Sequence, residues 1–209
     1  MLPPEEPSAS AGLLAALIEH LSDRDPQVRS RAAREIFALA LARAAPYVND
    51  WLRHADVAAC FVMEDRGAAA KFPRATVGIA VQPAALERIR TANASPPLAD
   101  VPPDLDAKEF ELAIDLATRL DILTTRDPHG DGAIARFLRK YGEGIQQMEL
   151  EVHSVDRTTE LLRTHFGLAP ILPRARPGAG GTRVNFFLLS GGSQGKLLIE
   201  LVEAHTADP

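Results

Sequence analysis

The sequence predicts an α+β protein built from two βαβββ modules behind a helical N-terminal extension. Apolar residues recur at helical spacing over 11–64. Short runs in which apolar and polar residues alternate, as they do in strands, occur in 74–126 and again in 130–204. Each of these two segments contains a strand, a helix, a crossing rich in proline or glycine, and closing strands, so we expect each to be one module.

Residues 1–10 contain three prolines and two glutamates, and they have little apolar surface to bury. We therefore expect a disordered tail there. Leucine and isoleucine recur at helical spacing over 11–21, which predicts the first helix.

The second helix is expected to begin at Asp25 and Pro26. An aspartate is a good N-cap, and a proline at the first helical position loses no hydrogen bond because the N–H there has no partner within the helix. We expect this helix to end near Ala45, because Pro46 interrupts the helical hydrogen bonds. A third helical stretch is expected over 47–63.

Residues 21–40, LSDRDPQVRSRAAREIFALA, resemble one HEAT repeat, in which Asp-Pro opens the second helix of a pair. A solenoid needs at least about three repeats to bury a core. We therefore expect an extension that packs on the modules or on a second subunit. Its arginines are expected to form a solvated helix face, with a partner-binding patch as the alternative; they are Arg24, Arg29, Arg31 and Arg34.

The first module follows an expected linker at 65–74. Its expected elements are a strand, a helix, a proline-rich crossing and two strands, at 76–82, 83–94, 95–104, 108–114 and 119–125. An expected helix at 132–141 links it to the second module, where we expect a strand over 144–152 and a helix opened by Ser154 or Asp156. The glycine-rich segment 191–195 lies between two expected strands and predicts a hairpin turn rather than a phosphate loop.

Glu200 is the residue of the last strand that most needs an explanation. It shares a strand face with Leu198 and Val202. A carboxylate buried there without a partner would cost several kcal/mol, so we expect a metal, another cation or a substrate opposite it. The alternative is an ordinary surface residue on a solvated face of an antiparallel sheet.

The composition excludes several classes of function. The formal net charge of -5 argues against a nucleic acid or an anionic membrane as partner. Cys60 is the only cysteine, so there is no intrachain disulfide and no cysteine-rich zinc site, and we expect it buried on a helix. No signal peptide and no apolar run of about 20 residues is present, which predicts a soluble, cytoplasmic protein.

Two stretches of the second module carry a family resemblance. Residues 132–152, GAIARFLRKYGEGIQQMELEV, and 176–203, RPGAGGTRVNFFLLSGGSQGKLLIELVE, resemble methylmalonyl-CoA epimerases, which are members of the vicinal oxygen chelate (glyoxalase) superfamily. Members of this superfamily contain two modules that curl around one cleft, which agrees with the internal duplication described above.

The resemblance implies a divalent metal held by four side chains, two from each module. The matching positions in this chain are Thr76, Asp121, Gln147 and Glu200. Epimerases of this family usually have histidine where Thr76 and Gln147 stand. Oxygen ligands favour Mg²⁺, Mn²⁺ or Co²⁺ over Zn²⁺, and a threonine hydroxyl is a poor substitute for imidazole.

The resemblance also implies two acid/base groups on opposite faces of the substrate carbon. Glu200 would be one of them, as metal ligand or as base, and Glu109 the other, with Glu111 on the same strand face. For these two glutamates of the first module, a solvated strand edge is the alternative. His153 is expected in a loop, and His165 near a helix C-terminus, where its charge would be favourable.

The leading functional hypothesis is an epimerase-like or glyoxalase-like enzyme, a homodimer, that acts on a carbon next to the carbonyl of a small molecule such as an acyl-CoA. The alternative is a non-catalytic protein of the same fold that binds a ligand or a partner and has lost the metal site. A dioxygenase is disfavoured, because a ferrous site usually needs two histidines.

Overall fold

The computed structural model describes residues 9–64, 72–190 and 196–203. The hairpin turn expected at 191–195, most of the expected tail and most of the expected linker lie outside these residues.

Three helices make up the N-terminal segment: α1 (Ala9–His20), α2 (Pro26–Trp51) and α3 (Ala55–Ala58). The start of α2 is as predicted. Asp25 is its N-cap and accepts a hydrogen bond from the backbone N–H of Gln27 at 2.8 Å. No helix in the described part of the chain is long and apolar enough to cross a membrane.

The predicted interruption at Pro46 is wrong, because α2 continues through this residue to Trp51. A proline inside a helix removes one hydrogen bond and crowds the preceding turn, at a cost of about 3 kcal/mol. Here Val48 and Trp51, beyond the proline, are buried in the main core. Burying side chains of this size stabilises by about 1.5–3 kcal/mol each, which is enough to keep the helix continuous. Of the third stretch expected over 47–63, only the short α3 forms a separate helix.

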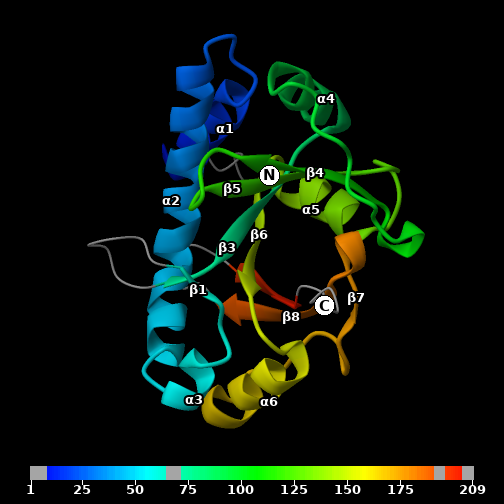
Figure 1. Cartoon of the computed structure of the whole chain (residues 1–209). Coiled ribbons are helices and arrows are strands. Elements are labelled where there is room, and N and C mark those ends of the chain that lie inside the picture. The colour runs from blue at the N-terminus through cyan, green and yellow to red at the C-terminus, as the bar shows by residue number, and fades with distance from the viewer. Residues whose placement is uncertain (1–8, 65–71, 191–195, 204–209) are drawn as a thin grey trace, which may run out of the picture.

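Seven strands form one curled sheet in the order β4-β5-β3-β6-β9-β8-β7 (Figure 1). Their bounds are Ala75–Ala80 (β3), Ala107–Ala113 (β4), Arg119–Thr125 (β5), Gly144–Glu151 (β6), Arg176–Pro177 (β7), Arg183–Ser190 (β8) and Lys196–Glu203 (β9). Three more helices belong to this part: α4 (Pro83–Ala92), α5 (Ala133–Tyr141) and α6 (Val155–Phe166). A separate two-stranded sheet pairs β1 (Met63–Glu64) with β2 (Phe72–Pro73).

The two modules meet at the centre of the sheet, where β3 and β6 pair antiparallel. In the first module β5 runs parallel to β3, with β4 antiparallel beside it. In the second module β9 runs parallel to β6, with β8 antiparallel beside it. The crossings differ: the second module carries β7, which pairs with β8, whereas the described crossing of the first carries a 3₁₀ turn, Pro103–Leu105, and no strand. The α+β fold of two related modules is thus confirmed.

The main core lies between the helices and one face of the sheet. Along β3 and β6 the side chains of Val77, Ile79, Met148 and Leu150 alternate onto this face and are buried there. They share a single core with Ile36 and other apolar residues of α2, which runs alongside the sheet in Figure 1. The N-terminal helices therefore pack on the modules, which is one of the two arrangements expected from the sequence; the other is packing on a second subunit.

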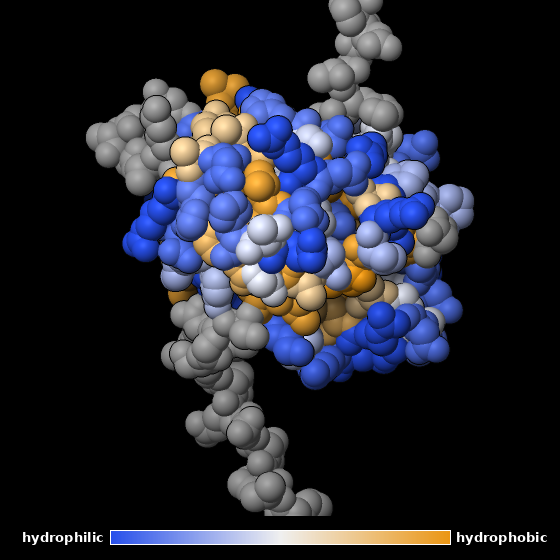
Figure 2. All heavy atoms as spheres, turned by 90° about the horizontal axis from the view of Figure 1, so that it is seen from below, coloured by the Kyte–Doolittle hydropathy of each residue, from blue (hydrophilic) through white to orange (hydrophobic). Residues whose placement is uncertain are grey.

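Large exposed hydrophobic side chains are scattered along the chain, at Leu13, Met63, Leu98, Leu116, Tyr141, Ile171 and Leu188. In the view from below, hydrophilic residues cover most of the surface, and hydrophobic residues show between them, most extensively in a hollow toward the lower right (Figure 2). Isolated apolar side chains of this kind are normal on a protein surface. The expected homodimer stays a prediction.

Candidate active site

A cavity of about 550 Å³ lies against the second face of the sheet and is lined by both modules. All the site residues predicted from the sequence line it: Thr76, Glu109, Glu111, Asp121, Gln147 and Glu200. The sheet therefore has one face against the helices and the other toward a ligand-sized space.

The register of the two central strands gives the modules an approximate two-fold relation. Thr76 lies opposite Glu149, and Gly78 lies opposite Gln147. A two-fold axis between these antiparallel strands exchanges Thr76 with Gln147 and Gly78 with Glu149. The two positions at which the resembling epimerases usually have histidine are therefore equivalent in space.

The parallel strand pairs obey the same relation. Gly78 pairs with Asp121 in the first module, and Glu149 pairs with Glu200 in the second. Asp121 and Glu200 are therefore equivalent as well, in agreement with the alignment of the two modules. The register also places Glu149 at the side of Glu200, on the strand that joins the modules.

A β-bulge separates Gln147 from the start of its strand. Gly78 pairs with Gln147 while the next residue, Ile79, pairs with Ile145, so Gln146 is an extra residue on β6. Gly78 leaves room for the side chain of Gln147, because a Cβ atom at position 78 would lie 2.6 Å from Cγ of Gln147. The bulge and the glycine together direct Gln147 into the cavity.

Gln147 links two carboxyl groups. Its Nε2 donates hydrogen bonds to Oε2 of Glu200 at 2.6 Å and to Oε1 of Glu149 at 3.0 Å. Glu149 also shares a hydrogen bond with Asp121, which requires that one of these two carboxyls carry a proton. A chain of hydrogen bonds thus runs from Asp121 across the module boundary to Glu200.

The environment raises the pKa of each carboxyl group in this cluster. Burial raises the pKa of Glu200 to about 8, with smaller contributions from Glu109 and Asp121. Burial and then the charge of Glu200 raise the pKa of Glu149 to about 8. Burial and then Asp121 raise the pKa of Glu109 to about 7, and burial and then Glu149 raise that of Asp121 well above its usual range. At neutral pH the cluster therefore holds protons that it can donate.

Glu149 is the site residue that sequence reasoning missed. The alternation of β6 puts Gln147, Glu149 and Glu151 on one polar face, which is a signal for all three. The metal-binding pattern of the resembling family corresponds to Thr76, Asp121, Gln147 and Glu200, and does not include Glu149. The decisive information is the pairing of β6 with both β3 and β9, which the sequence does not show.

Three arginines line the cavity, and two of them are ion-paired. Arg74 lies 3.1 Å from the carboxylate of Glu151, and Arg119 lies 3.8 Å from that of Glu64. Arg176 instead lies over the ring of Phe186, with the guanidinium carbon 5.8 Å from the ring centre.

The other singled-out residues lie outside the cavity lining. Nε2 of His165 is 2.8 Å from Oδ2 of Asp56. His153 is in a loop as predicted, and its backbone N–H donates to the carbonyl of Cys60. Cys60 is buried as expected, but it lies in the turn after α3 rather than on a helix.

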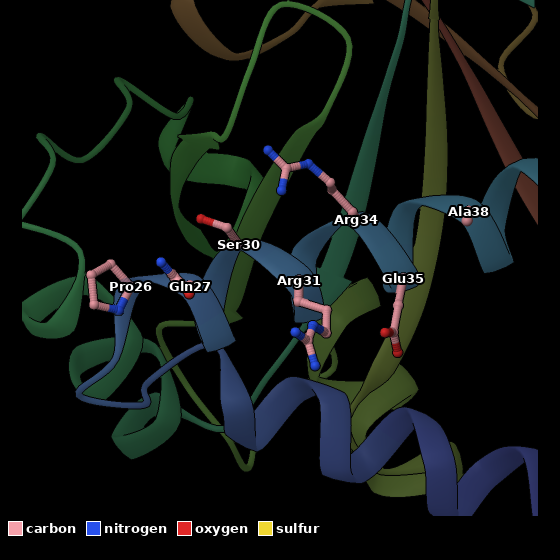
Figure 3. A pocket seen from close by; sticks show the side chains of 7 residues that line it. All are labelled: Pro26, Gln27, Ser30, Arg31, Arg34, Glu35 and Ala38. Carbon is pink, nitrogen blue, oxygen red and sulfur yellow. The ribbon is translucent and has the colours of Figure 1, made fainter.

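A second hollow lies along α2 alone and is lined by Pro26, Gln27, Ser30, Arg31, Arg34, Glu35 and Ala38. In Figure 3, Arg31 and Glu35 point to one side of the helix and Arg34 to the other. Arg34 forms a salt bridge with Asp115 at 3.1 Å, so part of its role is to attach the helix to the first module. Every residue that lines this hollow comes from one helix, which leaves the cavity between the modules as the candidate active site.

Of the four predicted metal positions, Asp121 and Glu200 offer carboxyl oxygens, whereas Thr76 and Gln147 offer no good ligand in this arrangement. Gln147 directs its amide nitrogen, which has no lone pair for a metal, at two carboxyl groups. Thr76 offers only a hydroxyl. Within the described residues, no three His, Cys, Asp or Glu side chains are placed to hold a metal ion. The predicted Mg²⁺, Mn²⁺ or Co²⁺ stays a prediction that a metal titration tests.

Comparison with known proteins places the chain in a family. No protein-family model and no curated protein matches it. Among solved structures, the methylmalonyl-CoA epimerase from Mycobacterium tuberculosis is 30% identical, with 62% of this chain and 86% of that chain aligned and a TM-score of 0.51.

A variant of the Streptomyces coelicolor methylmalonyl-CoA epimerase, in complex with 2-nitronate-propionyl-CoA, is 23% identical, with 64% of this chain and 95% of that chain aligned and a TM-score of 0.52. A hypothetical protein from Bacillus halodurans C-125 aligns with the same shares, the same identity and the same TM-score, and at this identity both show the fold alone. The 30% identity over 86% of the Mycobacterium tuberculosis enzyme, with the same fold, shows that the chain belongs to the methylmalonyl-CoA epimerase family of the vicinal oxygen chelate superfamily.

Proposed function

We propose that the protein is an epimerase-like enzyme that moves a proton at the carbon next to the carbonyl of an acyl-CoA. The observation that carries this proposal is the cluster of four carboxyl groups with raised pKa values, which lies in a cavity between the modules of an epimerase-family fold. General acid–base catalysis is most effective when the pKa of the catalytic group lies near the working pH.

Glu200 and Glu109 are the proposed catalytic pair. They come from different modules, on β9 and β4, and each lines the cavity. Inversion at a carbon requires one group to remove the proton from one face and another to deliver a proton to the opposite face. With pKa values of about 8 and about 7, one of the two can be ionised while the other is protonated at neutral pH.

Gln147 and the Asp121–Glu149 pair are proposed to hold the carboxyl group of Glu200 in position, because both N–H groups of the Gln147 amide already donate within the cluster. The enolate that forms after proton removal would be stabilised by the protonated member of the catalytic pair, since donors aimed at a developing negative charge lower the barrier. The mechanism contains no step through a metal. Mg²⁺, Mn²⁺ or Co²⁺ could join it only if Gln147 turned its amide oxygen toward the carboxyl groups.

The acyl-CoA substrate class is inferred from the relatives. One solved relative is in complex with methylmalonyl-CoA and NH4⁺, and another is in complex with 2-nitronate-propionyl-CoA. By analogy with these complexes, we propose that this chain binds a thioester and holds its reacting carbon beside the carboxyl cluster. Homodimer formation and a cytoplasmic location belong to the same proposal.

A second candidate function is ligand binding without catalysis. The threonine at position 76, where epimerases of the family usually have histidine, favours it. Such a protein would keep the cavity and bind its ligand without exchanging any proton.

Exchange of the substrate's α-proton for deuterium distinguishes the two functions. The protein is incubated in deuterated buffer with methylmalonyl-CoA, and deuterium incorporation is followed by mass spectrometry, in parallel with and without Mn²⁺, Co²⁺ or Mg²⁺. We expect exchange by the wild type, loss of at least about 100-fold in Glu200→Gln, and little change in Glu151→Gln, which removes a carboxylate of the same cavity that is paired with Arg74. Binding without exchange in the wild type would select the second function, and exchange that survives in Glu200→Gln would refute the assignment of Glu200 to the catalytic pair.

A further inference from the structure

The cavity contains polar atoms that its own side chains leave without partners. Four buried side-chain nitrogen or oxygen atoms in the described residues lack a hydrogen-bond partner, and three of them belong to cavity residues: Nε of Arg74, Oε1 of Gln146 and Nε of Arg176. Buried polar groups are nearly always hydrogen-bonded in folded proteins. The three side chains that carry these atoms line one cavity, so the protein's own groups leave this region the least satisfied of the described structure.

Arg176 is the cation best placed to receive a negative charge. Among the described residues no carboxylate forms a salt bridge with it, whereas the other two cavity arginines are paired with Glu151 and Glu64. Its guanidinium lies over the face of Phe186, a contact that uses none of its N–H groups. The donors of Arg176 are therefore available to a ligand.

The backbone holds this guanidinium close to the carboxyl cluster. Arg176 is the first residue of β7, which pairs with β8. Phe186, on β8, lies directly opposite Glu200 on β9. The positive charge of Arg176 lowers the pKa of Glu200, although burial has the larger and opposite effect. An anion bound to Arg176 would therefore lie on the same side of the cavity as Glu200.

The geometry points to Arg176 as the residue that binds a single carboxylate of the ligand and selects a carboxylated acyl group over a neutral one. A guanidinium matches a carboxylate with two parallel hydrogen bonds. The surrounding carboxyl groups would repel a phosphate dianion more strongly than a monoanion. Their protons can instead donate to a neighbouring carbonyl oxygen of the same ligand. The inference rests on the proposed function only in that it takes the same cavity as the ligand site.

Binding of small monoesters tests the assignment without any turnover. Isothermal titration calorimetry of the full chain would use monomethyl malonate, which has one carboxylate beside an ester carbonyl, and dimethyl malonate and inorganic phosphate as comparisons. We expect Arg176→Met to weaken binding of monomethyl malonate by about 10- to 100-fold. Arg176→Lys should weaken it by less, because lysine keeps the positive charge but cannot form the two parallel hydrogen bonds of a guanidinium.

Arg119→Met is the matched control, since it removes one positive charge from the same cavity but leaves Arg176 in place. It should weaken binding by less than about 3-fold. Equal losses in the two methionine variants, equal affinity of the wild type for dimethyl malonate, or no binding of the monoester would each overturn the assignment. So would tighter binding of phosphate. Thermal unfolding confirms that each variant is folded.

The two proposals can fail separately. If the wild type binds the monoester through Arg176 but exchanges no proton of a thioester, the proposed function fails and the assignment of Arg176 stands. If exchange occurs and Arg176→Met changes neither monoester binding nor the KM for methylmalonyl-CoA, the proposed function stands and the assignment of Arg176 fails.

Discussion

Replacing Glu200 by glutamine should make the protein more stable at neutral and alkaline pH while it removes activity. Glu200 keeps only 8% of its surface exposed, and its folded-state pKa is about 8 against 4.5 for an ordinary glutamate. Between these values the folded protein holds a proton that the unfolded chain releases. Stability therefore falls as the pH rises through this window, which is the reverse of an ion-paired carboxylate.

The size of the effect follows from linkage. One carboxyl with such a shift changes the free energy of unfolding by about 1.4 kcal/mol for each pH unit inside the window. From pH 5.5 to pH 7.5, Glu200 alone should lower stability by roughly 2.5 kcal/mol. The amide of Glu200→Gln does not titrate, and its oxygen can still accept the hydrogen bond from Gln147. The variant also removes a charge that raises the pKa of Glu149, so the neighbouring carboxyl should lose part of its own pH dependence.

Urea unfolding of both proteins at pH 5.5, 6.5 and 7.5, in the presence of a chelator, measures this difference. If the amide packs like the protonated carboxyl, the variant should be more stable by about 1.4 kcal/mol at pH 5.5, and the difference should grow to about 4 kcal/mol at pH 7.5. Glu151→Gln serves as control, because its carboxylate pairs with Arg74, and it should not gain stability with rising pH. The same slope against pH in Glu200→Gln and in the wild type would refute the argument that this carboxyl is buried at an energetic cost.

Two further predictions concern the geometry of the cavity. Gly78→Ala places a Cβ atom 2.6 Å from Cγ of Gln147 and should lower deuterium exchange by at least about 10-fold, with a loss of stability of about 1–3 kcal/mol. The control Gly12→Ala lies in α1 and meets nothing within 4 Å, so it should leave exchange unchanged and raise stability by up to about 1 kcal/mol. The exchange rate should pass through a maximum between about pH 7 and pH 8, since one of Glu109 and Glu200 must be protonated and the other ionised; a rate that rises without a maximum to pH 10 would contradict this pairing.

The fold could be predicted largely from periodicity. The expected strands at 119–125 and 144–152 correspond to β5 and β6, because the alternation of apolar side chains reports which residues face the core. Pro46 shows where such reasoning fails: local propensity predicts a break, and burial of the residues beyond it keeps the helix continuous.

The candidate site could be predicted only in part. The residues on the polar faces of β5, β6 and β9 are visible in the sequence, and all the predicted ones line the cavity. Which of them meet depends on register, and register is not a local property of the chain. The placement of Glu149 beside Glu200, and the bulge at Gln146 that turns Gln147 inward, are consequences of strand pairing alone.

The two inner strands at the module boundary present different side chains at equivalent positions. Where β3 presents Thr76 and Gly78, the equivalent positions of β6 present Gln147 and Glu149. One inner strand thus supplies empty volume and the other fills it with hydrogen-bonding side chains. The space that Gly78 leaves is taken up by the side chain of Gln147, so a substitution at this glycine, which carries no functional group, would displace the amide that links Glu149 to Glu200.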